Sequence, residues 1–353
     1  MQVQNNTTKL LKKSIFKLAI MKKRNLLAIF MTIIGVALIV ASLVIVYSYP
    51  YRHNYIDYTI SKYFIDNSTS IGITIFKIIT YLGEAIIYIA ILVILYYVWD
   101  KKKAYRAIVT LVSTTVVNAS AKTIFKADRP NDLYFPGNEV KETSYGLPSG
   151  HTQISTTFWG VLGYFVKKWG MLIVSIVLPL LIAFSRIYLV VHWFTDVLMG
   201  FGIAFIILAI FLVVLEPIEN YFENKSTSVK VGWSVGSGII FAIPIVLLHL
   251  FPVLELESMV DNLKYIAVFI TVSISYAIEG KLVNFDNKIE KWWKGVLRVL
   301  LAIVVLAGVY VYGEFFDPEP VTNLKMILDL MVFALLGPVL ILVLPWIMKK
   351  LKL

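Results

Sequence analysis

Ten apolar stretches of roughly twenty residues each constrain the fold of this chain more than any other feature. A helix of about 20 apolar residues is needed to cross the hydrocarbon core of a bilayer. The predicted spans cover residues 27–49, 70–98, 106–122, 151–166, 171–191, 195–216, 231–250, 263–279, 296–312 and 324–347. Only 16% of the 353 residues are charged, against about 25% in soluble domains. We therefore predict an all-α, polytopic membrane helix bundle with about ten spans.

The spans divide the chain into three predicted parts. The first is the basic segment 1–26, in which residues 8–21 alternate lysines with apolar residues at helical spacing. This pattern favours a helix on the membrane surface; a disordered basic tail is the alternative. Residues 27–217 hold the first six spans. Residues 218–353 add a four-span membrane region, and its pattern does not distinguish a dimer surface, a lipid gate or a partner-binding region. Gly232 and Gly236 form one GxxxG helix-packing motif there.

The distribution of charge predicts the orientation of the spans. With the N-terminus inside, the inner segments hold 23 of the 33 Lys and Arg residues but only seven of the 22 acidic residues. Because basic loops stay on the cytoplasmic side, we predict a multi-pass cell-membrane protein with both termini in the cytoplasm. The net charge of +11 then reflects topology, and no nucleic-acid partner is predicted. Since cysteine is absent, disulfides and a cysteine nucleophile are excluded.

Residues capable of chemistry are concentrated near the predicted outer ends of spans three to six. They lie in the segments KTIFKADRP, LPSGH and SRIYLVVHWFTD, and comprise Lys122, Arg129, Pro130, Pro148, Ser149, Gly150, His151, Ser185, Arg186, His192 and Asp196. Taken singly, a cation at a span end is usually an interface anchor, and a Pro-Ser-Gly run is usually a turn before a capped helix. Their convergence on one side of the membrane favours a site.

These residue types predict a pocket for phosphate. Arginine forks match phosphate oxygens in bidentate geometry, and Arg129 and Arg186 lie in the same group of segments as the cation of Lys122. A helix that begins at Ser149 and Gly150 would present free N–H groups to an anion. The sequence thus places three cations and a helix N-terminus on the predicted outer side.

Two histidines beside such a pocket could provide a nucleophile and a general acid. Asp196 follows His192 by four residues, so on a helix its carboxylate would hold the imidazole N–H and fix the tautomer. Ser185 is expected to form a local hydrogen bond and not to attack a substrate.

The three segments resemble the signature of the type-2 phosphatidic acid phosphatase superfamily, K-x6-RP, PSGH and SR-x5-H-x3-D, and they match it without departure. The resemblance extends over roughly residues 50–217 and implies that this six-span part is a phosphatase core. It implies that His192 attacks phosphorus and becomes phosphohistidine, and that Asp196 orients it. It also implies that His151 protonates the leaving oxygen and then activates water.

The resemblance further implies that cationic side chains neutralise the phosphoryl charge, with no metal ion or other cofactor. Phosphate-binding roles fall to Lys122, Arg129, Arg186, Ser149 and Gly150, with Pro130, Pro148 and Ser185 in support. The absence from the sequence of an Asp/Glu/His cluster with metal-ligand spacing agrees with this.

The expected substrate is a membrane lipid phosphate or a polyprenyl pyrophosphate, cleaved at the extracytoplasmic face. Phosphatidate, phosphatidylglycerol phosphate, a phosphorylated sphingoid base and a water-soluble phosphoester stay open, as does the oligomeric state. Tyr134, Phe135 and Pro136 either contact that lipid or pack at the interface. A phospholipid-binding transporter or flippase, or a catalytically inactive scaffold with the same pocket, is the alternative function.

Three charged residues lie within predicted spans. Lys77 and Glu84 are seven residues apart and would share one helix face. Intramembrane charges are functional candidates by default, but the favoured interpretation is that these two bond to polar neighbours such as Asn118 or Ser120. The third, Asp329, is predicted to stand alone in the last span.

Overall fold

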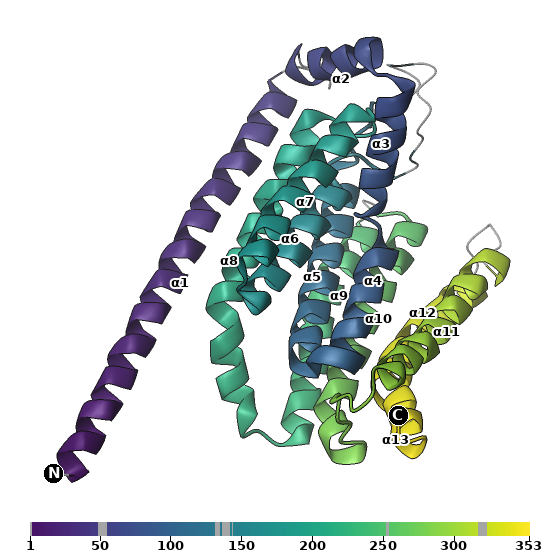
Figure 1. The fold of residues 1–353 in the computed structure, drawn as a ribbon. Coiled ribbons are helices and arrows are strands. Elements are labelled where there is room, and N and C mark those ends of the chain that lie inside the picture. Colours follow the sequence, from purple (N-terminus) through teal and green to yellow (C-terminus); the bar gives the residue numbers. More distant parts are fainter. Residues whose placement is uncertain are drawn as a thin grey trace.

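The computed structural model describes residues 2–48, 55–130, 135, 142, 144–251, 254–316 and 323–353, with side chains from residue 21 onward except those of residues 257, 313–316 and 323. Within these residues the regular structure is entirely helical (Figure 1). The elements are α1 (Gln2–Tyr47), α2 (Tyr55–Asn67), α3 (Ser70–Tyr81), α4 (Ala85–Ile94), the π-helical turn η1 (Leu95–Trp99), α5 (Lys101–Phe125), α6 (Gly150–Val166), α7 (Trp169–Tyr188), α8 (Phe194–Glu223), α9 (Thr227–Leu250), α10 (Leu256–Leu282), α11 (Trp292–Phe316), α12 (Asn323–Pro338), the π-helical turn η2 (Val339–Val343) and α13 (Leu344–Lys350).

The predicted all-α membrane bundle is confirmed. Among the described residues, eight helices are long and apolar enough to cross a membrane, and the bent pair of α3 and α4–η1 makes a ninth if it is one span. Helix α6 coincides with the fourth predicted span, which is not among these nine, because its 17 residues are fewer than a full crossing usually takes. The number of ten spans therefore stays a prediction.

The predicted span over residues 70–98 is not one continuous helix. It breaks between Tyr81 and Ala85 and bends by 42°. Backbone N–H groups of residues 82–84 reach back only three residues, with the Gly83 N–H donating to the Thr80 carbonyl at 2.8 Å. Glycine is a poor helix former, and here it ends α3 in the middle of the span. Glu84 consequently lies in the break and does not share a helix face with α3.

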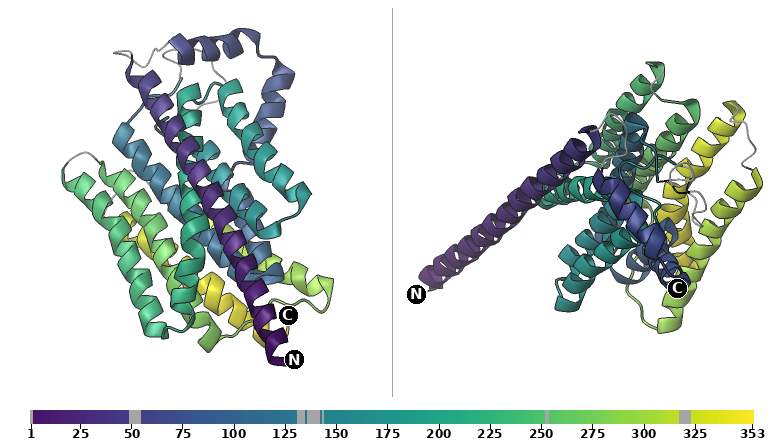
Figure 2. Two further views of the ribbon diagram at one scale, coloured as in Figure 1. Left: turned by 90° about the vertical axis from the view of Figure 1, so that its left-hand side faces the viewer. Right: turned by 90° about the horizontal axis from the view of Figure 1, so that it is seen from above.

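The helices run along one common direction, apart from α2, which crosses the upper end of the bundle in Figure 1. Helix α1 leans along α8, whereas α9 to α13 lie on the other side of the central group formed by α4 to α8 (Figures 1 and 2). Both chain ends lie at the lower end. Residues 2–26 continue α1 in line with the first span, and their place relative to the bilayer stays a prediction.

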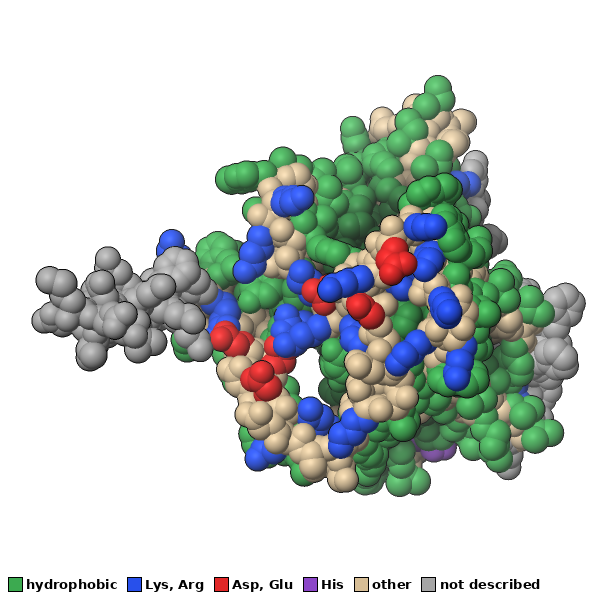
Figure 3. Space-filling model, turned by 60° about the horizontal axis from the view of Figure 1, so that its bottom comes forward, with side chains coloured by type: hydrophobic (Ala, Val, Ile, Leu, Met, Phe, Trp, Pro, Cys, Tyr) green, Lys and Arg blue, Asp and Glu red, His purple; other side chains and the backbone are tan. Residues whose placement is uncertain are grey.

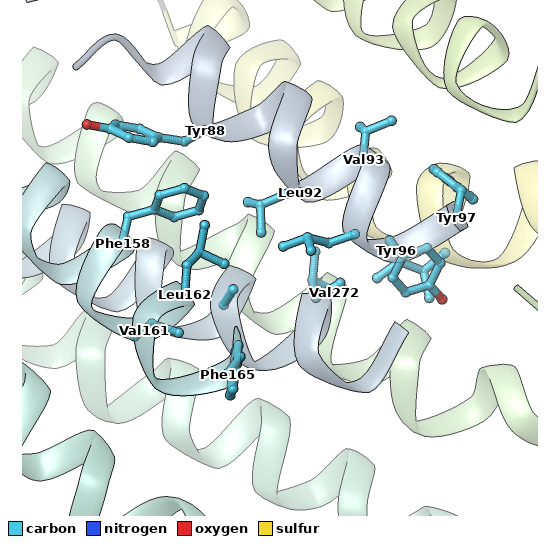
Figure 4. Packing of buried hydrophobic residues seen from close by; sticks show 14 of the residues in the cluster. Tyr88, Leu92, Val93, Tyr96, Tyr97, Phe158, Val161, Leu162, Phe165 and Val272 are labelled. Carbon is cyan, nitrogen blue, oxygen red and sulfur yellow. The ribbon is translucent and has the colours of Figure 1, made fainter. Parts of the chain in front are cut away.

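A buried apolar core joins α4 and η1 to α6 and α10 (Figure 4). The rings of Tyr88 and Phe158 lie 4.7 Å apart, between α4 and α6. Leu92 and Leu162 continue this contact, and Val272 brings in α10. The bend after α3 is what places α4 over α6.

Buried polar side chains fix the height of α6 relative to α5. The Gln153 side-chain amide donates to the Thr114 carbonyl at 2.9 Å and accepts from the Asn118 amide at 2.9 Å. Both partners are buried, so leaving either unpaired would be costly. These bonds lie one turn below the start of α6 and hold that start beside the end of α5.

Candidate active site

The three motif segments meet at the upper end of the bundle, where α5 and α7 end and α6 and α8 begin. Backbone and side-chain hydrogen bonds join them directly. The Ser149 N–H donates to the Asp196 carbonyl at 3.0 Å, and the Arg129 guanidinium donates to the Val191 carbonyl at 2.9 Å. Segments far apart in the sequence thereby form one cluster.

His192 and Asp196 are paired as predicted, but not on one helix. His192 lies in the turn between α7 and α8, and Asp196 lies in the first turn of α8. One Asp196 carboxylate oxygen lies 3.1 Å from His192 Nδ1 and also accepts from the Trp193 N–H at 3.1 Å. Gly146 provides the room, because a Cβ there would come within 2.8 Å of that oxygen. A helix N-terminus stabilises such a carboxylate.

The contacts of His192 define the tautomer of its imidazole. Arg129 Nη1 lies 3.0 Å from His192 Nε2. A guanidinium has only donors, so Nε2 accepts and Nδ1 carries the proton that is donated to Asp196. Burial, and after it the Arg129 cation, holds the pKa of His192 well below its usual value. The imidazole is therefore neutral, with its lone pair directed at the cations.

This shift predicts an unusual pH dependence. A lowered pKa keeps His192 in its neutral, nucleophilic form as the pH falls through about 6.5, where an ordinary histidine becomes protonated. After correction for the dianionic fraction of a phosphomonoester substrate, whose second pKa is about 6, we expect kcat/KM to stay level there. An acid limb centred near the ordinary histidine value would contradict this assignment.

The turn that carries His192 is strained. Val190 has a φ of 51°, a left-handed conformation that costs a non-glycine residue on the order of 1–3 kcal/mol. The N–H groups of Val191 and His192 both donate to the Arg186 carbonyl, at 3.2 and 3.3 Å. These bonds, together with the burial of Val190, hold the turn in a shape that presents His192 to the cations.

Three cations lie near the Nε2 side of His192, and oxygen atoms of the chain accept hydrogen bonds from them. The Ser144 hydroxyl accepts from Lys122 Nζ and from Arg129 Nη2, each at 2.9 Å. Arg186 donates to the Thr80 hydroxyl at 2.8 Å and to the Glu142 carboxylate. Its Nε is buried without a hydrogen-bond partner among the described residues, so one donor is free for a further oxygen.

Glu142 places a carboxylate among these cations. It bonds Arg186, and its other oxygen lies 3.8 Å from Arg129. Burial opposes its ionisation, but the Arg186 and Arg129 cations hold the pKa of Glu142 below its usual value. An ionised carboxylate between two arginines takes the position that an anionic ligand of those arginines would need.

We therefore expect Glu142→Gln to strengthen inhibition by inorganic phosphate and by vanadate. The arginines would no longer have to release the Glu142 carboxylate to bind an anion, so each inhibition constant should fall by roughly twofold to fivefold, the upper part of the range of a partly exposed ion pair. Glu142→Asp, which keeps the charge, is the matched control. Weaker inhibition of the Glu142→Gln variant would mean that Glu142 helps to build the anion site.

His151 lies in the first turn of α6, and its Nε2 is 3.2 Å from the Glu84 carboxylate. Glu84 is thus a site residue that sequence reasoning did not assign. The predicted contacts of Glu84 with Asn118 or Ser120 are not found, because Asn118 bonds Gln153 and Ser120 bonds Asn262. The only sequence signal was an acidic residue inside an apolar span.

The remaining predicted site residues lie around this cluster. Ser149 is the N-cap residue of α6, and its N–H donates to the Asp196 carbonyl, so this N–H is not available to an anion. The Ser185 hydroxyl donates to the Ile182 carbonyl at 2.6 Å, which confirms its local role. Pro130 is buried.

Other predicted features have simpler explanations. The Pro148 carbonyl accepts from the Asn118 amide at 3.4 Å. Phe135 is buried against Trp193, with ring centroids 6.2 Å apart, so it packs inside the protein; Tyr134 and Pro136 lie outside the described residues. Asp329 does not stand alone, because it accepts from the Tyr312 hydroxyl at 3.0 Å.

Comparisons with known proteins agree with the motifs. Residues 103–218 match a family model described as the PAP2 superfamily, and residues 263–353 match one described as the PAP2 superfamily phosphatase, transmembrane extension. The chain is 32% identical over 102 residues to the undecaprenyl-diphosphatase of Sulfolobus acidocaldarius, covering 28% of this chain and 49% of that protein. It is 34% identical over 77 residues to phosphatidylglycerophosphatase B of Bacillus subtilis, covering 19% and 38% respectively.

The chain thus spans about half or less of these curated relatives. The crystal structure of a PAP2 type phosphatidylglycerolphosphate phosphatase from Bacillus subtilis aligns with 52% of this chain and 96% of its own, at 23% identity and a TM-score of 0.44. The two family matches together cover more than half of the chain, and the first contains every residue of the three motifs. The chain belongs to the PAP2 superfamily.

Proposed function

We propose that the protein is a metal-independent phosphatase that removes phosphate from a membrane lipid phosphate through a phosphohistidine intermediate on His192. The observation that carries this proposal is the state of His192. Its Nδ1 faces the Asp196 carboxylate, and its Nε2 faces Arg129. A neutral imidazole whose lone pair is directed at a phosphate-binding cation is prepared to attack phosphorus.

The proposed reaction has two steps. In the first, the Nε2 lone pair of His192 forms a bond to phosphorus, the bond from phosphorus to the lipid oxygen breaks, and His151 gives that oxygen its proton. In the second, His151 takes a proton from water, the resulting hydroxide attacks phosphorus, and the N–P bond breaks to restore His192. Asp196 stabilises the positive imidazole in between.

The cations contribute to both steps. Lys122, Arg129 and Arg186 would bind the equatorial phosphoryl oxygens, as electrostatic stabilisation of the transition state requires. The unpartnered Nε of Arg186 offers a donor that the chain itself does not use. Because these three groups supply the positive charge, we propose that no metal ion takes part.

The proposed substrate class is a lipid with a phosphomonoester or diphosphate headgroup. Two similar proteins are named undecaprenyl-diphosphatase and phosphatidylglycerophosphatase B. Helix α2, at the same end of the bundle as the site, exposes Tyr55, Tyr58 and Tyr63. Tyrosines are enriched at the membrane–water boundary, where the phosphate of such a lipid lies while its chains stay in the bilayer.

A panel of lipid phosphates tests this function. Purified protein should release phosphate from at least one of phosphatidate, phosphatidylglycerophosphate and a polyprenyl diphosphate in detergent micelles. Release should persist in excess EDTA and be blocked by vanadate, which resembles pentacoordinate phosphorus. Loss of activity in EDTA that Mg²⁺ restores would exclude the metal-free mechanism. Binding of these lipids without phosphate release would favour a transporter, a flippase or an inactive scaffold.

We further propose that the site faces the extracytoplasmic side. Lys and Arg side chains gather on the lower face of the bundle (Figure 3), opposite the end where the motifs meet. Several of them, including Lys101 and Arg106, pair with acids on neighbouring helices. By the positive-inside rule, this basic face and both termini belong in the cytoplasm.

Introduced cysteines should report this orientation, because the native chain has none. Lys62 on α2 and Lys102 on α5 have similar exposed fractions, 52% and 60%, but lie at opposite ends of the bundle. An impermeant maleimide on intact cells is expected to label Lys62→Cys and to leave Lys102→Cys unlabelled until the membrane is permeabilised. The reverse pattern would place the site in the cytoplasm.

A further inference from the structure

The carboxylate of Glu84 contacts the second histidine of the site from inside a membrane span. Its Oε1 lies 3.2 Å from His151 Nε2, and the exposed fractions are 44% for the carboxylate side chain and 18% for the imidazole. Acidic residues within apolar membrane segments are rare and usually have a function. The Glu84 side chain also does not serve as a helix cap. Glu84 occupies the N-cap position of α4, but its carboxylate accepts no hydrogen bond from the first turn of that helix.

The break between α3 and α4 is shaped to bring Glu84 to the imidazole. A Cβ on Gly83 would lie 2.8 Å from Cδ2 of His151, so only glycine allows the backbone to come this close. On the same turn, Thr80 accepts from Arg186. A single irregular turn therefore reaches both His151 and a cation of the site, which explains why a span is interrupted where lipid would favour a continuous helix.

Glu84 is the acid that bonds His151 directly. The other titratable groups near the imidazole are Arg186 from α7, Glu142 from the segment before α6, and the neutral His192. Arg186 and Glu142 bond each other, so their charges largely offset one another. His192 already has Asp196 as its partner. Each histidine of the site therefore has a carboxylate of its own.

We propose that Glu84 is the positioning residue of His151: it accepts the Nε2 proton, fixes the ring, and stabilises the imidazolium that donates a proton to the leaving oxygen. Nδ1 has no hydrogen-bond partner among the described residues, so it is the nitrogen that exchanges a proton with substrate and water. This inference rests on the proposed phosphatase function and extends it to a fourth polypeptide segment, outside the three motifs.

The test compares Glu84→Gln with wild type on phosphatidate, which has a poor leaving group, and on 4-nitrophenyl phosphate, which has a good one. We expect kcat/KM, which reports the first step, to fall on phosphatidate on the order of 10–100-fold, part of the 10²–10⁴-fold that general acid catalysis contributes. On 4-nitrophenyl phosphate kcat/KM should change less than about threefold, since a nitrophenolate needs little protonation.

A pH profile distinguishes positioning from a structural role. Without the Glu84 charge, the protonated imidazole of His151 is less stable, so the alkaline limb of the phosphatidate profile should move to lower pH. Asp66→Asn is the matched control, because Asp66 is also a half-exposed carboxylate, paired with Lys62 on α2. It should leave both the rates and the profile unchanged.

The outcomes separate this inference from the function on which it rests. No phosphate release by wild type from 4-nitrophenyl phosphate or from any lipid phosphate of the panel would contradict the proposed function itself. An active wild type with an unchanged Glu84→Gln variant, or with equal losses on both substrates and an unmoved pH profile, would overturn the role of Glu84. Glu84→Ala serves as a second variant in case Glu84→Gln misfolds. Rates of all variants are compared per amount of monodisperse protein, so that a loss of folded protein is not counted as a loss of activity.

Discussion

Replacing His192 with alanine is expected to abolish phosphate release from every substrate. The nucleophile would be lost, and in other covalent enzymes such a loss costs on the order of 10⁴-fold or more in rate. The leaving group should make no difference, because the first bond to phosphorus cannot form. Rapid quenching with a labelled substrate should likewise give no phosphoprotein. Rates on phosphatidate and 4-nitrophenyl phosphate, together with the labelled protein, measure this outcome.

His249→Ala is the matched control for this experiment. His249 lies near the end of α9, where its Nδ1 contacts the Leu254 carbonyl at 2.8 Å, and it takes no part in the site. This variant should retain wild-type rates and form phosphoprotein normally. Substantial turnover by His192→Ala, or an acid-labile, base-stable label on it, would show that another residue is the nucleophile.

The sequence predicted the spans because the hydropathy of a segment depends only on its own residues and not on its tertiary contacts. The same averaging hid the break at residues 82–84, since one glycine and one glutamate hardly lower the mean of an apolar window of this length. Helix α2 (Tyr55–Asn67) was missed for a related reason. Its 13 residues mix tyrosines with polar groups and are too few to cross a bilayer.

The site residues with fixed spacing were predictable, and their partners were not. His192 and Asp196 meet as expected, but through a turn and a helix start, because a spacing of four residues suits that arrangement as well as a helix. Thr80, Glu142 and Ser144 contact the cations, yet a single hydroxyl at the end of α3, or a polar residue in the irregular segment before α6, carries no periodic signal. Their positions depend on packing between helices far apart in the sequence.

The positions of Val190 and Gly83 also come from tertiary structure. A valine in a left-handed turn contradicts its local preference, and it persists because the bonds to the Arg186 carbonyl impose that shape. Gly83 could be read from the sequence only as a helix breaker, whereas the close approach of His151 shows what the break is for. Local conformational preferences thus fail at residues that shape the site, which is expected because backbone strain is concentrated at functional sites.

The two histidines should respond differently to substitution, and His151→Ala is the variant that separates them. His192 keeps its contacts with Asp196 and Arg129, so it can still attack phosphorus. The proton for the leaving oxygen is missing, and general acid catalysis is typically worth about 10²–10⁴-fold. Phosphatidate hydrolysis should therefore fall by that amount or more, whereas attack on 4-nitrophenyl phosphate should continue, because nitrophenolate leaves without a proton.

The second step should then expose the other role of His151. Without a base to activate water, hydrolysis of the N–P bond slows, so His151→Ala should accumulate a phosphoprotein that wild type forms only transiently. Quenching the variant with labelled 4-nitrophenyl phosphate should trap a label that is labile in acid and stable in base, as phosphohistidine is. The time course of nitrophenol release should begin with a burst of about one equivalent per protein before the steady state, since the first step is faster than the second. If the label accumulated on His192→Ala and not on His151→Ala, the proposed roles would be reversed: His151 would be the nucleophile, and His192 would be the general acid and base.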